Sequence, residues 1–281
     1  MTAGEIETHA RLVEVLRQQA SALLAIQAID PRTAGIFATQ QRWLLAHLAL
    51  SIHFEGGREG VAAAKILAAA EAHGVASRNT ADAFLREMLK YGYLAPVPGH
   101  RDRRLRPLIP TEHAAGSIAA WLRIHLSSLD QLDGADRLRR FLARPESIAG
   151  IHPRIAEGLL ASSAVRRPAP TFSLFTCLNE GGVVMDWLYV GLADFPPDAD
   201  RVHTSVAAFA DFRERIHLSR THLARKLRAA EDLGSLGWQG ARGASPMWVS
   251  MAFVREYHAQ QSAKLAIVGG AFARAADEGA V

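Results

Sequence analysis

The sequence predicts a mainly α-helical fold with small β elements, arranged as two similar modules in one chain. Ala-rich stretches with apolar residues at intervals of three and four dominate, whereas alternating runs typical of strands are few and short. One segment also resembles another at an offset of 142 residues. The chain has 281 residues, of which 49% are hydrophobic, enough for one large domain or two of ordinary size.

The first helix is expected over residues 6–29. Thr2 and Glu5 have the spacing of a capping box, and Asp30 followed by Pro31 ends the apolar stripe. Further helices are expected at residues 39–54, 61–73, 77–91 and 111–131, separated by Gly-rich or Pro-rich breaks. The pairs Gly181-Gly182 and Gly269-Gly270 have the look of turns or helix ends.

Residues 162–171 (SSAVRRPAPT) have the composition of a linker, with small residues, a basic pair and two prolines. We therefore expect an N-terminal domain over residues 1–165 and a C-terminal domain over residues 166–281.

The internal similarity aligns residues 77–94 with residues 219–236. Six of the eighteen positions are identical, where roughly one is expected by chance at average residue usage. Apolar positions also keep their register, because Ala81, Leu85 and Met88 align with Leu223, Leu227 and Ala230. The pattern predicts two helices with the same buried stripe.

The face opposite this stripe carries side chains that suit nucleic acid. Arg can bond guanine in a forked geometry, Asn can bond adenine, and the other basic and hydroxyl groups can hold phosphates. An ordinary solvated helix face would carry similar charges. The candidate DNA-binding residues on the two helices are Ser77, Arg78, Asn79, Asp82, Arg86 and Lys90, and Ser219, Arg220, Thr221, His222, Arg225 and Arg228.

A basic hairpin is expected directly after the first of these helices. Two short extended runs flank residues 98–104, where Pro98 and Gly99 favour a turn. The basic residues of this turn and of the following strand, which can reach phosphates or a minor groove, are Arg101, Arg103, Arg104 and Arg106.

Residues 5–132 resemble the MarR family of winged helix-turn-helix regulators. The resemblance is carried by helices at residues 40–50 and 61–73, a Ser-initiated helix ending in Lys-Tyr-Gly-Tyr-Leu, and the run Asp102-Arg103-Arg104 followed by a strand and Thr111-Glu112. In that family Asp-Arg-Arg marks the wing, and Thr-Glu opens the next helix.

This resemblance implies that Ser77, Arg78, Asn79 and Arg86 belong to a recognition helix, and that Arg103 and Arg104 belong to a wing. Family members dimerise through terminal helices and often respond to small phenolic or other anionic ligands. Here a second similar module stands in place of a second subunit, so a monomeric pseudo-dimer and a homodimer are both open.

The second module departs from the family pattern in its wing. Residues 237–249 contain a single basic residue, Arg242, and no Asp-Arg-Arg. Residues 77–106 nevertheless carry a net charge of +4 and residues 219–248 a net charge of +3, whereas the whole chain carries +4. Positive charge is thus concentrated on the two segments, although the second module could also serve folding or pairing without binding DNA.

Other classes of protein have little support in the sequence. A single cysteine, Cys177, excludes an intramolecular disulfide framework, and the histidines show no ligand spacing for a metal. No nucleophile, Walker or dinucleotide motif is present, so we expect no catalysis and no cofactor. Acidic residues near Met1 and the lack of a long apolar run indicate a cytoplasmic protein without a membrane span.

The sequence therefore predicts a mainly α protein with two tandem winged helix-turn-helix domains, small β-hairpin wings and packing or linker helices. The expected function is sequence-specific binding of double-stranded DNA in transcriptional control, with half-sites about one helical turn apart, or a multiple of it, and imperfectly symmetric. The alternative is a winged-helix scaffold for protein interactions without sequence-specific DNA binding. Aromatic residues that could line a small-molecule effector pocket, or form plain core, are Trp43, Trp121, Phe172, Phe175 and Trp187.

Overall fold

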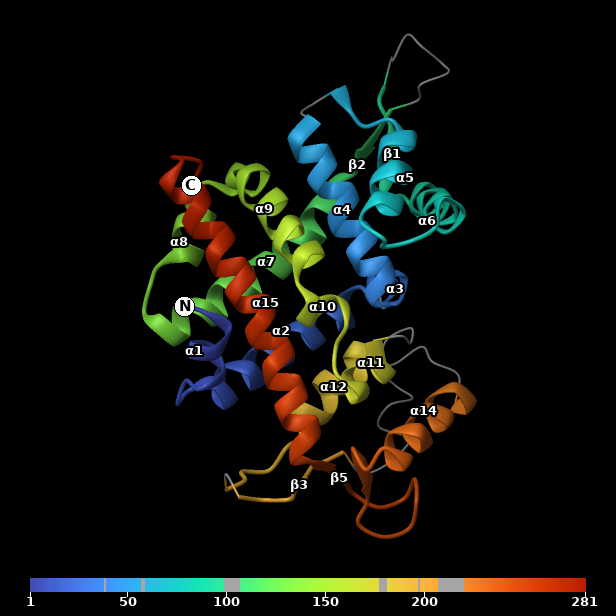
Figure 1. The fold of residues 1–281 in the computed structure, drawn as a ribbon, viewed down its shortest axis with the longest axis vertical. Coiled ribbons are helices and arrows are strands. Elements are labelled where there is room, and N and C mark those ends of the chain that lie inside the picture. Colours follow the sequence, from blue (N-terminus) through green and yellow to red (C-terminus); the bar gives the residue numbers. More distant parts are fainter. Residues whose placement is uncertain (38, 57–58, 99–106, 177–180, 197, 207–219) are drawn as a thin grey trace. The chain divides into compact units, whose positions relative to one another are not determined.

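A computed structural model of the chain shows a mainly helical protein with two small antiparallel sheets (Figure 1). It describes residues 1–281 except 38, 57–58, 99–106, 177–180, 197 and 207–219. Four side chains within helices also lie outside this description, those of Arg32, Ala34, Arg220 and His222. None of the helices in the described part is both long and apolar enough to cross a membrane.

The chain forms two compact units, each built from two separate stretches of sequence. Unit 1 combines Met1–Gln40 with Ser163–Ala266, and unit 2 combines Gln41–Ser162 with Ile267–Val281. The junction between residues 162 and 163 lies beside the boundary expected near residue 165. The two termini, however, each belong with the opposite half of the sequence.

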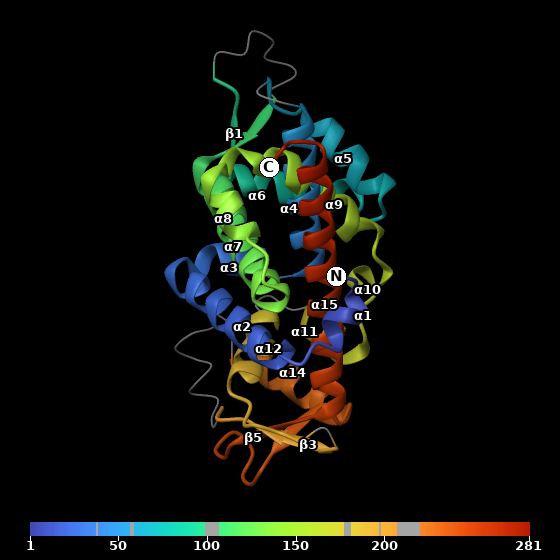
Figure 2. The ribbon, with the colours of Figure 1, turned by 90° about the vertical axis from the view of Figure 1, so that its left-hand side faces the viewer.

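Unit 1 contains most of the C-terminal half together with the first helices. Helices α2 and α12 pack against each other, and the views of Figures 1 and 2 agree on this. Its elements are α1 Ala3–Glu7, α2 Leu12–Ile29, α3 Pro31–Ile36, α10 Ser163–Arg166, α11 Pro170–Thr176, α12 Gly181–Val190, β3 Arg201–His203, α14 Arg220–Asp232, β4 Leu236–Trp238, β5 Met247–Ser250 and the first part of α15 Met251–Asp277.

Unit 2 contains residues 41–132 of the segment that resembles the MarR family, whereas residues 5–40 of that segment belong to unit 1. Helix α5 packs on α6 (Figure 1), and α7 packs on α8 (Figure 2). Its elements are α4 Gln40–Gly56, α5 Ala63–Ala72, α6 Arg78–Lys90, β1 Leu94–Pro96, β2 Leu108–Pro110, α7 Glu112–Asp133, α8 Arg137–Ala143, a 3-10 turn at Pro145–Ser147, α9 Ile148–Ala161 and the last part of α15.

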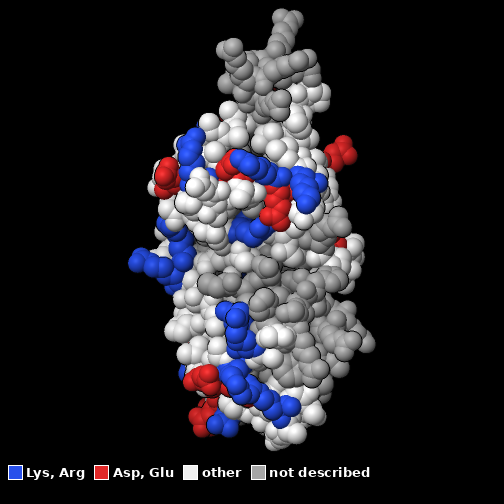
Figure 3. All heavy atoms as spheres, turned by 90° about the vertical axis from the view of Figure 1, so that its right-hand side faces the viewer, with Lys and Arg blue, Asp and Glu red and all other residues white. Residues whose placement is uncertain are grey.

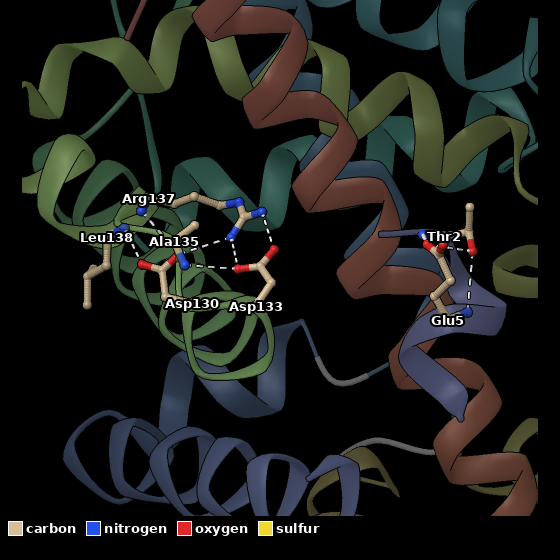
Figure 4. A network of polar contacts seen from close by, with 7 residues as sticks. All are labelled: Thr2, Glu5, Asp130, Asp133, Ala135, Arg137 and Leu138. Carbon is tan, nitrogen blue, oxygen red and sulfur yellow. Dashed lines mark hydrogen bonds and ion pairs between the residues drawn. The ribbon is translucent and has the colours of Figure 1, made fainter. Parts of the chain in front are cut away.

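The N-terminal helix expected over residues 6–29 is two helices, α1 and α2. The capping box is confirmed, because the Thr2 hydroxyl accepts from the Glu5 N–H and the Glu5 carboxylate accepts from the Thr2 N–H (Figure 4). The prediction of one continuous helix over residues 6–29 was wrong. His9 Nδ1 accepts the backbone N–H of Arg11 at 3.1 Å, which takes that donor away from a helical partner and separates α1 from α2.

The linker expected at residues 162–171 contains helical turns. Helix α10 begins at Ser163, and Val165 is buried with its carbonyl accepting from the side-chain amide of Gln40. Gly269 and Gly270 lie inside α15, which corrects the expectation of a turn or helix end there. A Cβ at Gly269 would meet the Leu129 side chain at 3.5 Å, an ordinary van der Waals contact.

A polar network closes α7 and starts α8 (Figure 4). Gly134 ends α7 in the left-handed conformation, with φ of 74°. The Arg137 guanidinium donates to Asp133 at 2.6 Å and to Asp130 at 3.1 Å, and the Asp130 carboxylate also accepts the Leu138 N–H at 2.8 Å. These bonds from Arg137 lower the pKa of Asp133.

The two small sheets have the same strand order. In unit 2, Leu108 of β2 pairs with the isolated Val61 on one side, and β2 pairs with β1 on the other. In unit 1, β5 pairs with β3 on one side and β4 on the other. In both units the strand that is last in sequence is therefore central, and a long helix follows it.

Candidate nucleic-acid interface

Helix α6 is bounded by two local signals. The Ser77 hydroxyl accepts the Thr80 N–H at 3.3 Å at its start. At its end Gly92 has φ of 76°, and the Tyr93 N–H donates to the Met88 carbonyl at 2.9 Å, as in a Schellman motif. Its buried side chains are Ala81, Phe84, Leu85 and Met88. The apolar stripe predicted from the sequence is thus the buried face of α6.

Contacts from α4 hold α6 in place. Arg42 forms an ion pair with Glu87 at 2.8 Å, and its guanidinium lies 5.6 Å from the centre of the Phe84 ring. The neighbouring Gln41 side chain donates to the carbonyl of Val75, just before α6, at 3.0 Å. These contacts fix which face of α6 remains available to a partner.

The available face carries the predicted residues, which we call the α6 surface: Ser77, Arg78, Asn79, Asp82, Arg86 and Lys90. All are exposed except Asp82, which is partly exposed. Arg86 Nη2 lies 2.6 Å from Asp82 Oδ2, with the Arg86 side chain 78% exposed. The Lys90 ammonium lies 5.6 Å from the centre of the Tyr91 ring. The surface therefore combines hydrogen-bonding groups with cations.

Helix α14 of unit 1 begins and ends 142 residues after α6, at Arg220 and Asp232. Its buried residues Leu223, Leu227 and Ala230 lie at the positions aligned in sequence. Gly234 has φ of 69°, and the Ser235 N–H donates to the Ala230 carbonyl at 2.9 Å, reproducing the end of α6.

We call the exposed residues Thr221, Arg225 and Arg228 of α14 the α14 surface. Asp232, the last residue of α14, is also exposed. Among the described residues, none forms an ion pair with Arg225 or Arg228. Asp82 of α6 has Ala224 as its counterpart, and Lys90 has Asp232. Ser219 and the side chains of Arg220 and His222 lie outside the described part.

The strands that follow α6 and α14 pair in the same register. Leu94 pairs with Pro110 and Leu236 with Val249. Thr111 caps α7, where its hydroxyl accepts the Ala114 N–H at 3.4 Å; Ser250 does the same for α15, accepting the Phe253 N–H at 3.1 Å. A hairpin and the N-terminus of a long helix thus follow each candidate DNA-binding helix.

The loops within the hairpins differ. The segment joining β1 to β2 is three residues longer than the segment joining β4 to β5. The predicted wing residues Arg101, Arg103, Arg104 and Arg106 fall within residues 99–106, outside the described part. Arg242, the candidate in the second loop, forms an ion pair with Glu231 of α14. This pairing reduces the charge that Arg242 offers to phosphates.

Some basic side chains on the described surface lie beside acidic ones. Figure 3 shows Asp and Glu next to Lys and Arg at a few places on the face drawn, whereas other Lys and Arg on this face have no acidic side chain beside them. The ion pairs of Arg86 with Asp82 and of Arg242 with Glu231 are examples. Any attraction for a polyanion therefore depends on particular cations rather than on one broad basic area.

The aromatic residues considered for an effector pocket divide between the units. Trp43 and Trp121 belong to unit 2, with ring centres 6.2 Å apart, whereas Phe172, Phe175 and Trp187 belong to unit 1. Phe172 and Phe175 are buried. Trp43, Trp121 and Trp187 are partly exposed.

Unit 2 contains a histidine pair that the sequence spacing could not reveal. His47 Nδ1 and His152 Nε2 lie 3.1 Å apart, and both residues are only 1% exposed. Burial lowers the pKa of His152 to about 3, and its Nδ1 atom is buried without a hydrogen-bond partner. The two residues are 105 positions apart, on α4 and α9, so periodicity gives no signal for the pair.

Unit 1 contains a second group of desolvated ionisable residues. The Tyr257 hydroxyl donates to Asp186 Oδ1 at 2.6 Å, and Tyr189 stacks on Tyr257 with ring centres 4.3 Å apart. Desolvation raises the pKa of Asp186 to about 6 and lowers that of Lys264 to about 8. Asp186 lies on α12 and Tyr257 on α15. The sequence shows that each has apolar neighbours along the chain, but it gives no signal that the two residues meet.

No described group of three or more His, Cys, Asp or Glu residues is arranged to hold a metal ion. No family model matches the chain, and no curated protein or solved structure matches it either. The resemblance to MarR regulators therefore depends on the sequence motifs alone.

Proposed function

We propose that the chain is a winged helix-turn-helix protein that binds double-stranded DNA with sequence preference in transcriptional control. One observation carries the proposal. Both units present a helix that ends at a left-handed glycine, with its apolar stripe buried and arginines on its exposed face, followed by an antiparallel hairpin. A helix of this kind fits the major groove of B-DNA, where base edges can be read.

In this proposal α6 enters a major groove, with Asn79 and Arg86 facing base edges and Ser77 and Arg78 near phosphates. The arginines of residues 99–106 reach the backbone or the minor groove, as the sequence motif suggests. The α14 surface contacts DNA through Arg225 and Arg228. Two modules in one chain can serve as a pseudo-dimer, and the measured number of chains per operator distinguishes this from a homodimer.

The test is a selection of bound duplexes from a random library, followed by titrations of selected and random duplexes at several salt concentrations. We expect a preference for selected sequences, and an affinity that falls steeply between low and physiological salt. Binding without preference, or without salt dependence, contradicts the proposal.

A protein-interaction scaffold is the second candidate. One observation favours it: Arg242, the basic residue of the second loop, is paired with Glu231 and so offers less charge to phosphates. This candidate predicts that duplex DNA of any sequence fails to bind the unaltered chain.

A further inference from the structure

The α6 surface contains one ion pair in which a carboxylate can hold an arginine in an orientation suited to contacting a base. Asp82 and Arg86 lie one helical turn apart, with Oδ2 and Nη2 at 2.6 Å. The Asp82 side chain is 38% exposed and that of Arg86 is 78% exposed. The carboxylate thus engages one side of the guanidinium, while most of the arginine side chain remains accessible to a partner.

Such support favours base discrimination over general affinity. An arginine held in one orientation loses less conformational freedom when its fork engages the O6 and N7 atoms of guanine. The pair of Asp82 and Arg86 is also electrically neutral, so it adds little to the attraction between a cation and phosphates.

The α14 surface lacks this support. Arg228 occupies the position that Arg86 occupies in α6, but the residue one turn earlier is Ala224. Arg225 and Arg228 are both exposed, and no described residue forms an ion pair with either. Two exposed cations that no described residue pairs with suit phosphates, which are present at every DNA sequence.

We propose that Asp82 is a positioning residue that orients Arg86 toward a guanine in the major groove, and that the α14 surface supplies affinity through phosphates. This inference rests on the proposed DNA-binding function. It assigns the two surfaces different partners: α6 reads one G·C base pair through Arg86, whereas α14 holds duplex of any sequence. The base sequence of the preferred DNA is accordingly specific where α6 contacts it and variable elsewhere.

The experiment uses the full chain, a selected duplex, the set of its single-base-pair variants and a random duplex. Arg86→Ala should reduce discrimination at one G·C pair by about tenfold. Asp82→Ala should relax discrimination at the same pair, while its affinity for random duplex stays equal or rises because a negative charge is removed. Asp82→Glu, which keeps a carboxylate within reach, should retain the discrimination.

The α14 surface provides the matched control. Arg228→Ala should weaken binding to selected and random duplexes by the same factor, with the single-base-pair preferences unchanged. Ala224→Asp places a carboxylate one turn before Arg228, so it should lower affinity for random duplex and reduce the salt slope by about one. Thermal unfolding of each variant checks that the chain remains folded.

Two results overturn the inference while DNA binding stands: Asp82→Ala keeps full discrimination at the pair that Arg86→Ala relaxes, or Arg228→Ala changes base preference as Arg86→Ala does. If the unaltered chain shows neither base preference nor salt-dependent binding, the proposed function fails first, and the inference fails with it.

Discussion

The segments built around α6 and α14 share their framework and differ on their surfaces. Three aligned buried positions, a left-handed glycine and the same closing hydrogen bond recur in both. The outward residues change, with Asp82 replaced by Ala224 and Lys90 by Asp232. Packing restricts the inner face, because a lost or added methylene group there costs stability, whereas solvated positions can vary.

The loops differ more than the helices do. The shorter loop of unit 1 has its Arg242 paired with Glu231, and the longer loop of unit 2 carries four arginines in sequence. Equal frameworks therefore do not imply equal roles. Perturbing matched positions in the two segments tests both the shared framework and the different surfaces.

The largest expected effect comes from the shared buried stripe. Leu85 and Leu227 are 2% and 0% exposed, so Leu85→Ala and Leu227→Ala should each lower the free energy of unfolding by about 2–5 kcal/mol. Urea unfolding followed by circular dichroism measures this. Ala83→Ser on the exposed face of α6 is the control, with little change expected. If only one of the two leucine variants loses stability, the two helices do not share the same buried framework.

The stability of the two units should respond differently to acid. The pKa of His152 is about 3 in the folded chain and about 6.5 in the unfolded chain, so below pH 6.5 the unfolded state binds the proton first. Stability from this group is complete above pH 6.5 and is lost as pH falls toward 3, with a slope approaching about 1.4 kcal/mol per pH unit.

In unit 1 two groups oppose each other. The pKa of Asp186 is raised to about 6, so its contribution to stability falls as pH rises from about 4 to 6. Burial lowers the pKa of His258 to about 4; this residue lies on α15 with Nε2 2.7 Å from the Tyr189 hydroxyl oxygen, and its contribution to stability falls as pH falls. We therefore expect His152→Phe to flatten the loss of stability between pH 6.5 and 4.5, measured by urea unfolding. His113→Phe, at an exposed position, is the control, and equal pH profiles of the wild type and His152→Phe contradict this prediction.

The wings should differ in their dependence on salt. Replacing Arg103 and Arg104 together by Ala should weaken binding to all duplexes and flatten the slope of log affinity against log salt by about two. Arg242→Ala should change the slope by less than one, because Glu231 already pairs with this charge. Fluorescence anisotropy at four salt concentrations gives both slopes. An unchanged slope in the double variant removes the wing from the proposed mechanism.

Base preference offers a smaller test of the α6 surface. Asn79→Ala should relax preference at one base pair by about 1–3 kcal/mol while leaving the salt slope unchanged. The counterpart Thr221→Ala should change base preference less. Competition binding with single-base-pair variants measures both. A Thr221 effect as large as the Asn79 effect would show that both helices read sequence.

The smallest effect is expected at the helix caps after the two hairpins. Thr111→Ala and Ser250→Ala should each lower the free energy of unfolding by about 1 kcal/mol, because an N-terminal amide loses its acceptor. Thr111→Asp and Ser250→Asp, which keep an acceptor, should retain most of the stability. Equal losses from the Ala and Asp variants would remove the shared caps from the comparison.

Much of the local structure could be predicted because its causes lie close together in sequence. Ser77 and Gly92 bound α6 through hydrogen bonds within one turn, and the spacing of Ala81, Leu85 and Met88 sets the buried face. The first helix was mispredicted because the His9 side chain competes for the Arg11 amide, a detail that apolar periodicity does not contain.

The sequence by itself determined the mainly helical class, the offset between the two segments, and which face of α6 and α14 packs. Tertiary structure decided which distant stretches form each unit, and it brought His47 to His152 and Asp186 to Tyr257. It also paired Arg242 with Glu231, whereas the pairing of Arg86 with Asp82 follows from their spacing of one helical turn. The reason is physical: periodicity and capping involve near neighbours, whereas desolvation and most side-chain pairing depend on where the folded chain places groups in space.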